Sequence, residues 1–162
     1  LGDATWVHVG ALLRSDFELP ALEALSEGRR LLLDGQGLVR RAQVGPLVRD
    51  ADIDPAVLHT LDVLKLNEDE ARILAGGLEP DRLRALGVPE VVLTLGSDGS
   101  LLVTGSEAER LAQVPVAEVV DPTGAGDSFC AAYLHARAQG AEPVEAMRAA
   151  GELTAELLAA PA

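Results

Sequence analysis

Short apolar runs alternate along the chain with segments that carry apolar residues at helical spacing. Continuous apolar runs are typical of strands covered on both faces, whereas a spacing of three and four residues is typical of a helix with one buried face. The runs predict strands at residues 5–13, 31–34, 62–66, 91–95 and 100–104, with one or two more within 112–120. The spacing predicts helices at residues 20–25, 55–58, 67–75, 80–86, 128–136 and from 143 onward.

The order of these elements indicates the fold class. Strands alternate with helices through the first half, a turn at residues 96–99 joins two strands as an antiparallel hairpin, and two helices complete the chain. This order predicts one α/β domain over residues 1–162, with a mostly parallel sheet between two layers of helices. In the last helix, an apolar stripe is expected to face the core; it consists of Ala146, Met147, Ala150, Leu153 and Leu157.

A glycine-containing stretch, DPTGAGD at residues 121–127, stands where an apolar-flanked segment gives way to a helix. The first turn of a helix carries backbone N–H groups without partners and the positive end of the helix dipole, and glycines let an anion approach the backbone closely. Asp127 in that turn has two open interpretations. It can act as an N-terminal cap and dipole partner, or it can take a proton from a hydroxyl that attacks a bound phosphate.

Composition narrows the classes of partner. The net charge is −13, with a single lysine, Lys65, and twelve arginines, which excludes a basic surface for nucleic acid. No apolar run reaches the length of a membrane span, so no membrane partner is expected. One cysteine, Cys130, excludes an internal disulfide and fits a reducing, cytoplasmic compartment. Cys130 and His8 are each flanked by apolar residues, and we expect a buried thiol and a satisfied core histidine.

Residues 121–129, DPTGAGDSF, resemble the C-terminal signature of the ribokinase-like (PfkB-type) sugar and nucleoside kinases, D-T/P-x-G-A-G-D-x-F, at every defined position. The resemblance implies a ribokinase-like three-layer α/β/α fold. It also implies an ATP-dependent transferase, a carbohydrate kinase that moves the γ-phosphoryl group to a hydroxyl of a sugar or nucleoside-like small molecule. In such a kinase, Gly124, Ala125 and Gly126 would form an anion hole and Asp127 would be the catalytic base.

Two further motifs stand where this family has them. Asn67 and Glu70 form an N-x-x-E motif, for which the resemblance implies contacts with phosphate and with Mg²⁺, Glu70 acting through water. A helix-capping pair is the alternative from spacing alone, and both roles can hold together. Thr94, Gly96 and Gly99 match T-x-G-x-x-G, which contacts the nucleotide in the family. A hairpin with an Asp-Gly turn is the alternative.

Polar residues follow the strand at residues 31–34. Asp34 and Arg40 lie where open α/β sheets bind ligands, and a glycine-rich turn with solvated arginines is the alternative. Related kinases often carry D-x-N-x-R here, and Gln36 takes the place of the Asn. The resemblance also makes Asp121 and Thr123 candidate ligands of a monovalent cation such as K⁺.

The resemblance covers nearly the whole chain but only the C-terminal half of such a kinase. The absent N-terminal part normally supplies the β lid and the di-glycine region that grips the substrate. We therefore expect this chain alone to be inactive and to self-associate through an uncovered sheet edge, for instance as a homodimer. A non-catalytic nucleotide-binding or degenerate kinase half is the alternative function. A dinucleotide-binding oxidoreductase domain is disfavoured because no G-x-G-x-x-G follows the first strand.

Overall fold

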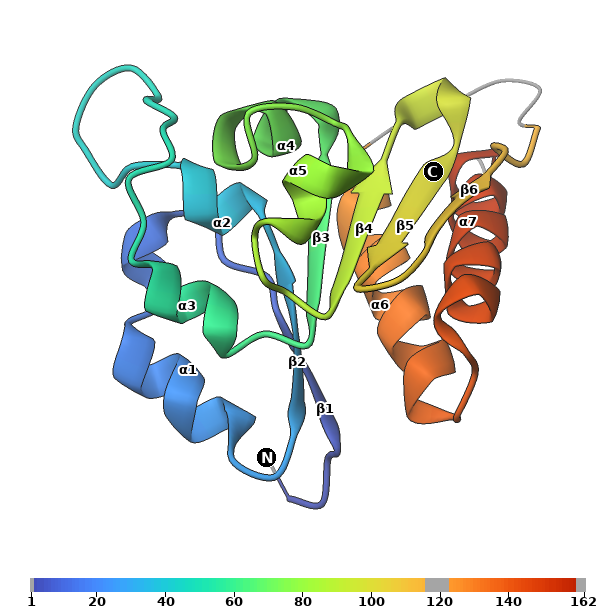
Figure 1. The fold of residues 1–162 in the computed structure, drawn as a ribbon, viewed down its shortest axis with the longest axis horizontal. Helices are drawn as coiled ribbons and strands as arrows, with labels where there is room; N and C mark the ends of the chain where they lie inside the picture. The colour runs from blue at the N-terminus through green and yellow to red at the C-terminus, as the bar shows by residue number, and fades with distance from the viewer. Residues whose placement is uncertain (1, 116–122, 160–162) are drawn as a thin grey trace.

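A six-stranded sheet lies at the centre of the described chain, residues 2–115 and 123–159 of this computed structural model (Figure 1). Its strands are β1 (Trp6–Val9), β2 (Arg30–Asp34), β3 (Val63–Asn67), β4 (Glu90–Thr94), β5 (Ser100–Thr104) and β6 (Ala108–Leu111). The helices are α1 (Leu19–Ser26), α2 (Gln36–Val39), α3 (Pro55–His59), α4 (Glu68–Leu74), α5 (Pro80–Arg84), α6 (Ala125–Ala138) and α7 (Pro143–Ala159), with 3-10 turns η1 (Arg14–Asp16) and η2 (Gly96–Asp98).

The strands follow one another across the sheet in chain order, from β1 to β6. β1 to β4 are parallel, β5 is antiparallel to β4, and β6 is antiparallel to β5. The carboxyl ends of the parallel strands therefore share one edge of the sheet. In register, Asp34 on β2 lies beside Lys65 on β3, and Asn67 on β3 lies beside Thr94 on β4. Four polar residues that are distant in sequence thus meet at the edge where α/β sheets bind ligands.

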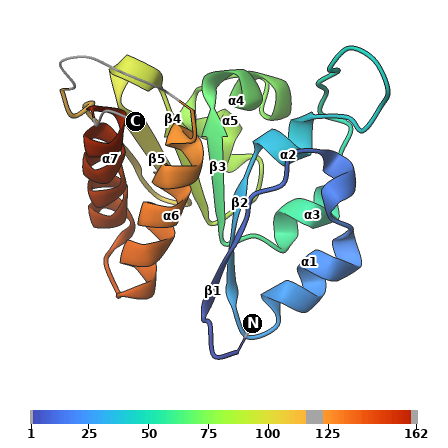
Figure 2. The same ribbon diagram turned by 180° about the vertical axis from the view of Figure 1, so that it is seen from behind.

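Two layers of helices cover the sheet. Alternation along β2 turns Leu31 and Leu33 toward the core under α1, α3, α4 and α5, and turns Leu32 toward the core under α6 and α7, where Tyr133 and Met147 are buried. Figure 2 shows α6 and α7 together on one face of the sheet, with α1 and α3 on the other. The predicted three-layer α/β/α architecture with a mostly parallel sheet is confirmed.

One local prediction about the connections is wrong, and another is tested only in part. The glycine-rich turn after β2 is a short helix, α2, because Asp34 Oδ1 accepts a hydrogen bond from Gln36 N at 3.0 Å and Gly35 O accepts from Leu38 N at 3.0 Å. A strand expected within residues 112–120 is not found at 112–115, and residues 116–120 lie outside the described part. The strand that pairs with β5 is β6, whose mostly exposed residues give little apolar signal.

The predicted apolar stripe of α7 is correct only in part. Ala150 and Met147 are buried, but Leu153 is 44% and Leu157 51% exposed. The buried face continues through Thr154 instead, because α7 packs along α6 and β5. Neither α7 nor any other described helix is long and apolar enough to cross a membrane.

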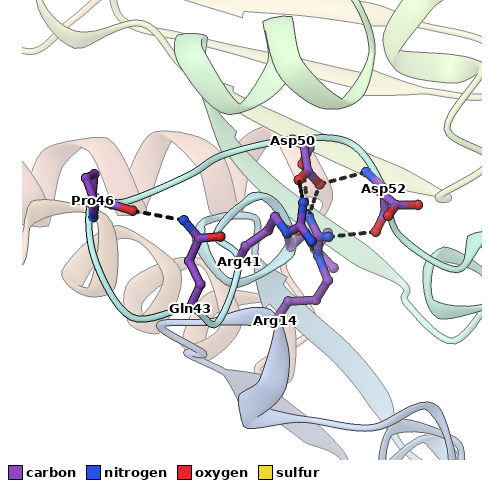
Figure 3. A network of polar contacts seen from close by, with 7 residues as sticks. Arg14, Arg41, Gln43, Pro46, Asp50 and Asp52 are labelled. Carbon is purple, nitrogen blue, oxygen red and sulfur yellow. Dashed lines mark hydrogen bonds and ion pairs between the residues drawn. The ribbon is translucent and has the colours of Figure 1, made fainter.

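An exposed loop joins α2 to α3 and protrudes at the end of the sheet toward which β3 and β4 run (Figure 1). Arg14 of η1 binds residues on both sides of this loop (Figure 3). Its guanidinium donates to Leu38 O of α2 at 2.8 Å. It also donates to Asp50 Oδ1 at 2.8 Å and to Asp52 O at 2.6 Å, near the end of the loop that leads to α3. Arg41 adds a looser contact, 3.6 Å from Asp50 Oδ2. The hydrogen bond from Arg14 lowers the pKa of Asp50 below its ordinary value.

Candidate functional site

Helix α6 begins directly after the glycine-containing stretch. Gly124 is its N-cap and adopts a left-handed backbone conformation, with φ +77°, which a residue with a side chain rarely adopts. Ala125 is the first helical residue, and Ser128 N donates to Gly124 O at 2.8 Å. The amides before Ser128 have no intrahelical acceptor, so this turn presents N–H groups and the positive end of the dipole. Asp127 stands in the same turn and is exposed, not buried in an ion pair among the described residues.

A buried ion pair lies on the sheet beneath this turn. Lys65 Nζ is 3.1 Å from Asp34 Oδ2, and the two side chains are only 7% and 9% exposed. A Cβ atom added to Gly126 would lie 2.9 Å from Lys65 Nζ and 3.6 Å from Asp34 Oδ2. Cys130, one turn further along α6, is buried as predicted, with Sγ 3.8 Å from the same Asp34 oxygen. The absence of a side chain at Gly126 therefore lets the helix start rest directly on the ion pair.

The charges around the ion pair act on one another. Burial acts to lower the pKa of Lys65, but the charge and hydrogen bond of Asp34, with smaller contributions from Cys130 and Glu70, together act to raise it, and the net shift is upward. Burial lowers the pKa of His8, while the nearby Asp34 and Asp127 carboxylates act to raise it. Lys65 is thus a fixed cation at neutral pH, and His8 is neutral.

The expectation of a satisfied core histidine at His8 is wrong. Its Nε2 atom is buried and has no hydrogen-bond partner among the described residues. The reason is its place in the sheet: it lies on β1 at the binding edge, beside the charged groups around Asp34 and Asp127 rather than deep in an apolar core.

Asn67 and Glu70 form a capping box at the start of α4. Glu70 N donates to Asn67 Oδ1 at 2.9 Å, while Asn67 N and Nδ2 each donate to the Glu70 carboxylate at 2.8 Å. Glu70 is buried, and burial raises its pKa. The capping interpretation is therefore confirmed, and it leaves the Asn67 side chain at the sheet edge, where it lines a cleft.

Thr94 and Gly99 bracket the turn η2. Thr94 Oγ1 donates to Leu66 O at 3.2 Å, which ties the end of β4 to β3. Gly99 has φ +90°, and a Cβ atom there would collide with the backbone oxygen of Leu111. A glycine is needed at this position so that the chain after β6 can pass closely over the turn.

A cleft of about 1110 Å³ opens at this edge of the sheet. It gathers residues predicted for the site from β3, β4, η2 and α6, namely Asn67, Thr94, Gly96, Gly99, Ala125 and Gly126. Much of the remaining wall is apolar and comes from the end of β6, the segment after it, α6 and α7, namely Leu111, Ala112, Val114, Pro115, Phe129, Met147, Gly151 and Leu158. Within the described part of the chain, Glu70, Gly124 and Asp127 do not line this cleft. Asp127 directly follows a lining residue and acts on His8, on the β1 side of the turn.

Sequence reasoning missed several charged residues that line the cleft, namely Lys65, Glu68, Asp69, Arg72, Arg148 and Glu152, and of these Lys65 is the buried one. The signal was present: a lysine in the buried run of β3 must find a counter-charge, because an unpaired buried charge is strongly unfavourable. The predicted monovalent-cation ligands remain a prediction, because Asp121 lies outside the described residues. Thr123 is described and is exposed, next to Gly124.

The comparisons with known proteins identify the family and the fold. The sequence model of the pfkB family of carbohydrate kinases matches residues 3–159. The chain belongs to the pfkB carbohydrate kinase family. Among curated relatives of this pfkB-family chain, a ribokinase from Arabidopsis thaliana is 35% identical over 109 residues, which are 61% of this chain and 29% of the relative.

Solved structures of the family share the fold. The structure of Arabidopsis thaliana ribokinase complexed with ribose and ATP matches with a TM-score of 0.79 and 27% identity. The match covers 98% of this pfkB-family chain and 51% of the ribokinase chain. A pyrophosphate-dependent kinase in the ribokinase family, complexed with a pyrophosphate analog and myo-inositol, matches with a TM-score of 0.85 and 24% identity, over 99% and 60% of the two chains. The present chain therefore spans little more than half the length of these solved relatives.

Proposed function

We propose that this pfkB-family chain forms the donor side of a kinase that moves the γ-phosphoryl group of ATP to a hydroxyl of a sugar or nucleoside-like molecule. The observation that carries the proposal is that the cleft ends at the first turn of α6, where Asp127 is exposed next to Gly126. Phosphoryl transfer requires a positioned donor, stabilisation of charge on the moving group and a residue that orients or deprotonates the nucleophile. The cleft and the first turn of α6 together offer a candidate group for each of these requirements.

The wall of the cleft favours a nucleotide over pyrophosphate as the donor. A base and ribose need apolar surface with a few polar groups, which residues 111–115 and α7 provide around Gly151 and Met147. Polar groups that suit the phosphates, among them Asn67, Thr94 and Lys65, line the same cleft, and Lys65 Nζ lies against the first turn of α6. Among relatives, one structure holds ATP and another comes from a pyrophosphate-dependent kinase, so family membership alone does not choose the donor.

In the chemical step, the backbone amides of the turn and the Asp127 side chain have different roles. The amides of Gly124, Ala125 and Gly126 donate hydrogen bonds to the phosphoryl oxygens as negative charge grows there, the kind of preorganised stabilisation that accelerates such reactions most. Asp127 accepts the proton of the acceptor hydroxyl. Its exposure on the β1 side of the turn leaves room for an acceptor that the cleft itself does not hold.

Magnesium fits this site as a companion of the nucleotide. Within the described residues, no group of three or more His, Cys, Asp or Glu side chains could hold a metal ion without help. Mg²⁺ commonly keeps several waters and takes one or two carboxylates together with substrate phosphates, and when bound it neutralises phosphate charge. Glu70 is hydrogen-bonded to Asn67 and would act through water, while Glu68 and Asp69 line the cleft. K⁺ near Asp121 and Thr123 is proposed on the family motif alone.

The proposal is tested by assaying the full-length protein with ATP and, separately, with pyrophosphate, against a panel of pentoses, hexoses, inositols and nucleosides. We expect phosphorylation of one class of acceptor with ATP and none with pyrophosphate. Tight nucleotide binding without transfer to any acceptor would instead support the alternative function, a non-catalytic nucleotide-binding module.

A further inference from the structure

Lys65 combines burial with unused hydrogen-bonding capacity. It lies on β3 between Leu64 and Leu66, both fully buried. Its ammonium carries three N–H donors, and Asp34 Oδ2 is the one acceptor recorded for them among the described residues. Lys65 nevertheless lines the cleft, and its Nζ lies where a side chain at position 126 would otherwise be. Two N–H donors are thus available at the point where the cleft meets α6.

We propose, on the basis of the kinase function proposed above, that Lys65 is a further catalytic residue, whose ammonium binds an oxygen of the transferring phosphoryl group from beneath the first turn of α6. Asp34 is a positioning residue in this arrangement, because it holds the ammonium at 3.1 Å from its Oδ2. Because Gly126 has no side chain, it leaves the space in which the ligand can reach Lys65 and Asp34.

The local charge balance favours such a cation, which would act together with Arg72 and Arg148, two arginines that also line the cleft. Three carboxylates, of Asp34, Glu70 and Asp127, act on the charged groups around this turn, and the whole chain carries a net charge of −13. A phosphoryl group would be repelled here if only peptide dipoles opposed these charges. The Asp34 carboxylate raises the pKa of Lys65, so the ammonium is charged at the pH at which kinases work. Because the pair already holds it, little reorganisation is needed when charge develops on the phosphoryl oxygens.

The transfer step balances without a proton from Lys65. The acceptor oxygen forms a bond to the γ-phosphorus, and its proton passes to Asp127. The bond from the γ-phosphorus to the bridging oxygen breaks, and its electron pair leaves with the nucleoside diphosphate. Lys65 stays protonated, and its hydrogen bond strengthens as charge moves onto the phosphoryl oxygens.

The test uses the full-length protein and three variants. Lys65→Met alone leaves Asp34 buried without a partner and is expected to destabilise the fold. Lys65→Met/Asp34→Asn removes both charges and is the variant that we expect to fold, as checked by its melting temperature. Lys65→Arg keeps the charge and the ion pair. Arg82→Met, which removes an exposed arginine of α5, is the matched control.

We expect the double variant to lose about 100-fold to 1000-fold in kcat, as for removal of a transition-state donor, with nucleotide affinity changed by less than about threefold. Lys65→Arg is expected to keep more turnover than the double variant, and Arg82→Met to match the wild type. Turnover of the double variant within about threefold of the wild type would overturn the inference. Equal turnover of Lys65→Arg and the double variant would overturn it as well. Asp127→Asn, assayed in parallel, separates this failure from failure of the proposed function, because only the latter leaves Asp127→Asn active.

Discussion

Asn67 and Glu70 satisfy each other across the first turn of α4 through three hydrogen bonds, with Glu70 N 2.9 Å from Asn67 Oδ1 and both Asn67 nitrogens 2.8 Å from the Glu70 carboxylate. The family motif is therefore also a helix cap, and it contributes to stability whether or not a ligand is bound. Because this carboxylate is only 6% exposed, its titration is linked to folding.

The linkage gives a pH prediction for Glu70. Burial raises its pKa in the folded protein above the value in the unfolded chain, so the folded state binds the proton more tightly. Its contribution to stability is therefore fully present below the unfolded pKa and is lost as pH rises through the folded pKa, about 1.4 kcal/mol for each pH unit between the two. Glu70→Gln does not titrate, so its stability relative to wild type should rise as pH increases from acid to neutral.

Urea unfolding of wild type and Glu70→Gln at a series of pH values measures this difference. Glu68→Gln, which alters an exposed carboxylate of the same helix, is the control and should show no such trend. A difference between wild type and Glu70→Gln that does not vary with pH would contradict the assigned burial of Glu70.

Alanine substitutions of two glycines in the same turn should have different effects, one mainly on stability and the other mainly on turnover. Gly124 has open space around it but φ +77°, so Gly124→Ala is expected to lose roughly 1–2 kcal/mol of stability from the left-handed backbone. Gly126 lacks that constraint, but a methyl group there would lie 2.9 Å from Lys65 Nζ, so the end of this long side chain must shift while it stays paired with Asp34. Gly126→Ala is therefore expected to lose less stability than Gly124→Ala and to lose about 100-fold in turnover through the displaced ammonium.

Melting curves and kinetics of the two variants provide the comparison. The reverse pattern, with a stable Gly124→Ala and an unfolded Gly126→Ala, would mean that the turn is not arranged as described.

Gly151 offers a way to test the donor wall of the cleft. A Cβ atom there would meet nothing within 4 Å, so a larger residue would project into free space of the cleft. Gly151→Leu should raise the KM for ATP by about tenfold or more by steric exclusion, without loss of stability, since leucine favours a helix more than glycine does. Gly105→Leu is the matched control, because Gly105 also has open space but does not line the cleft. An equal KM in both variants would place the nucleotide elsewhere.

The parts of the fold with strong local signals could be predicted from the sequence. The apolar runs of β2, β3 and β4 are buried on both faces, and the glycine-containing stretch before Phe129 does begin a helix. These features depend on periodicity and on local backbone chemistry, which a single sequence records. The same holds for the cap formed by Asn67 and Glu70, whose spacing alone indicates it.

The parts that depend on packing could not be predicted. β6 is a strand because β5 offers it a free edge, and its own residues are mostly exposed. Leu153 and Leu157 fit the helical period of α7, yet they face solvent because the helix rotates to pack on α6. The pairing of Lys65 with Asp34 arises from register between two strands that are 31 residues apart in sequence. Such a pair becomes visible only when the sheet is assembled.

Asp127 carries the central claim, and one measurement tests it most directly: the rate of phosphoryl transfer by Asp127→Asn in the full-length protein, determined together with its affinity for ATP. The substitution keeps the size of an exposed side chain and removes its capacity to accept a proton. We expect turnover to fall by roughly 100-fold or more, while the dissociation constant for ATP stays close to that of the wild type. Turnover that survives the substitution would contradict the assignment of Asp127 as the base, and with it the proposed kinase site.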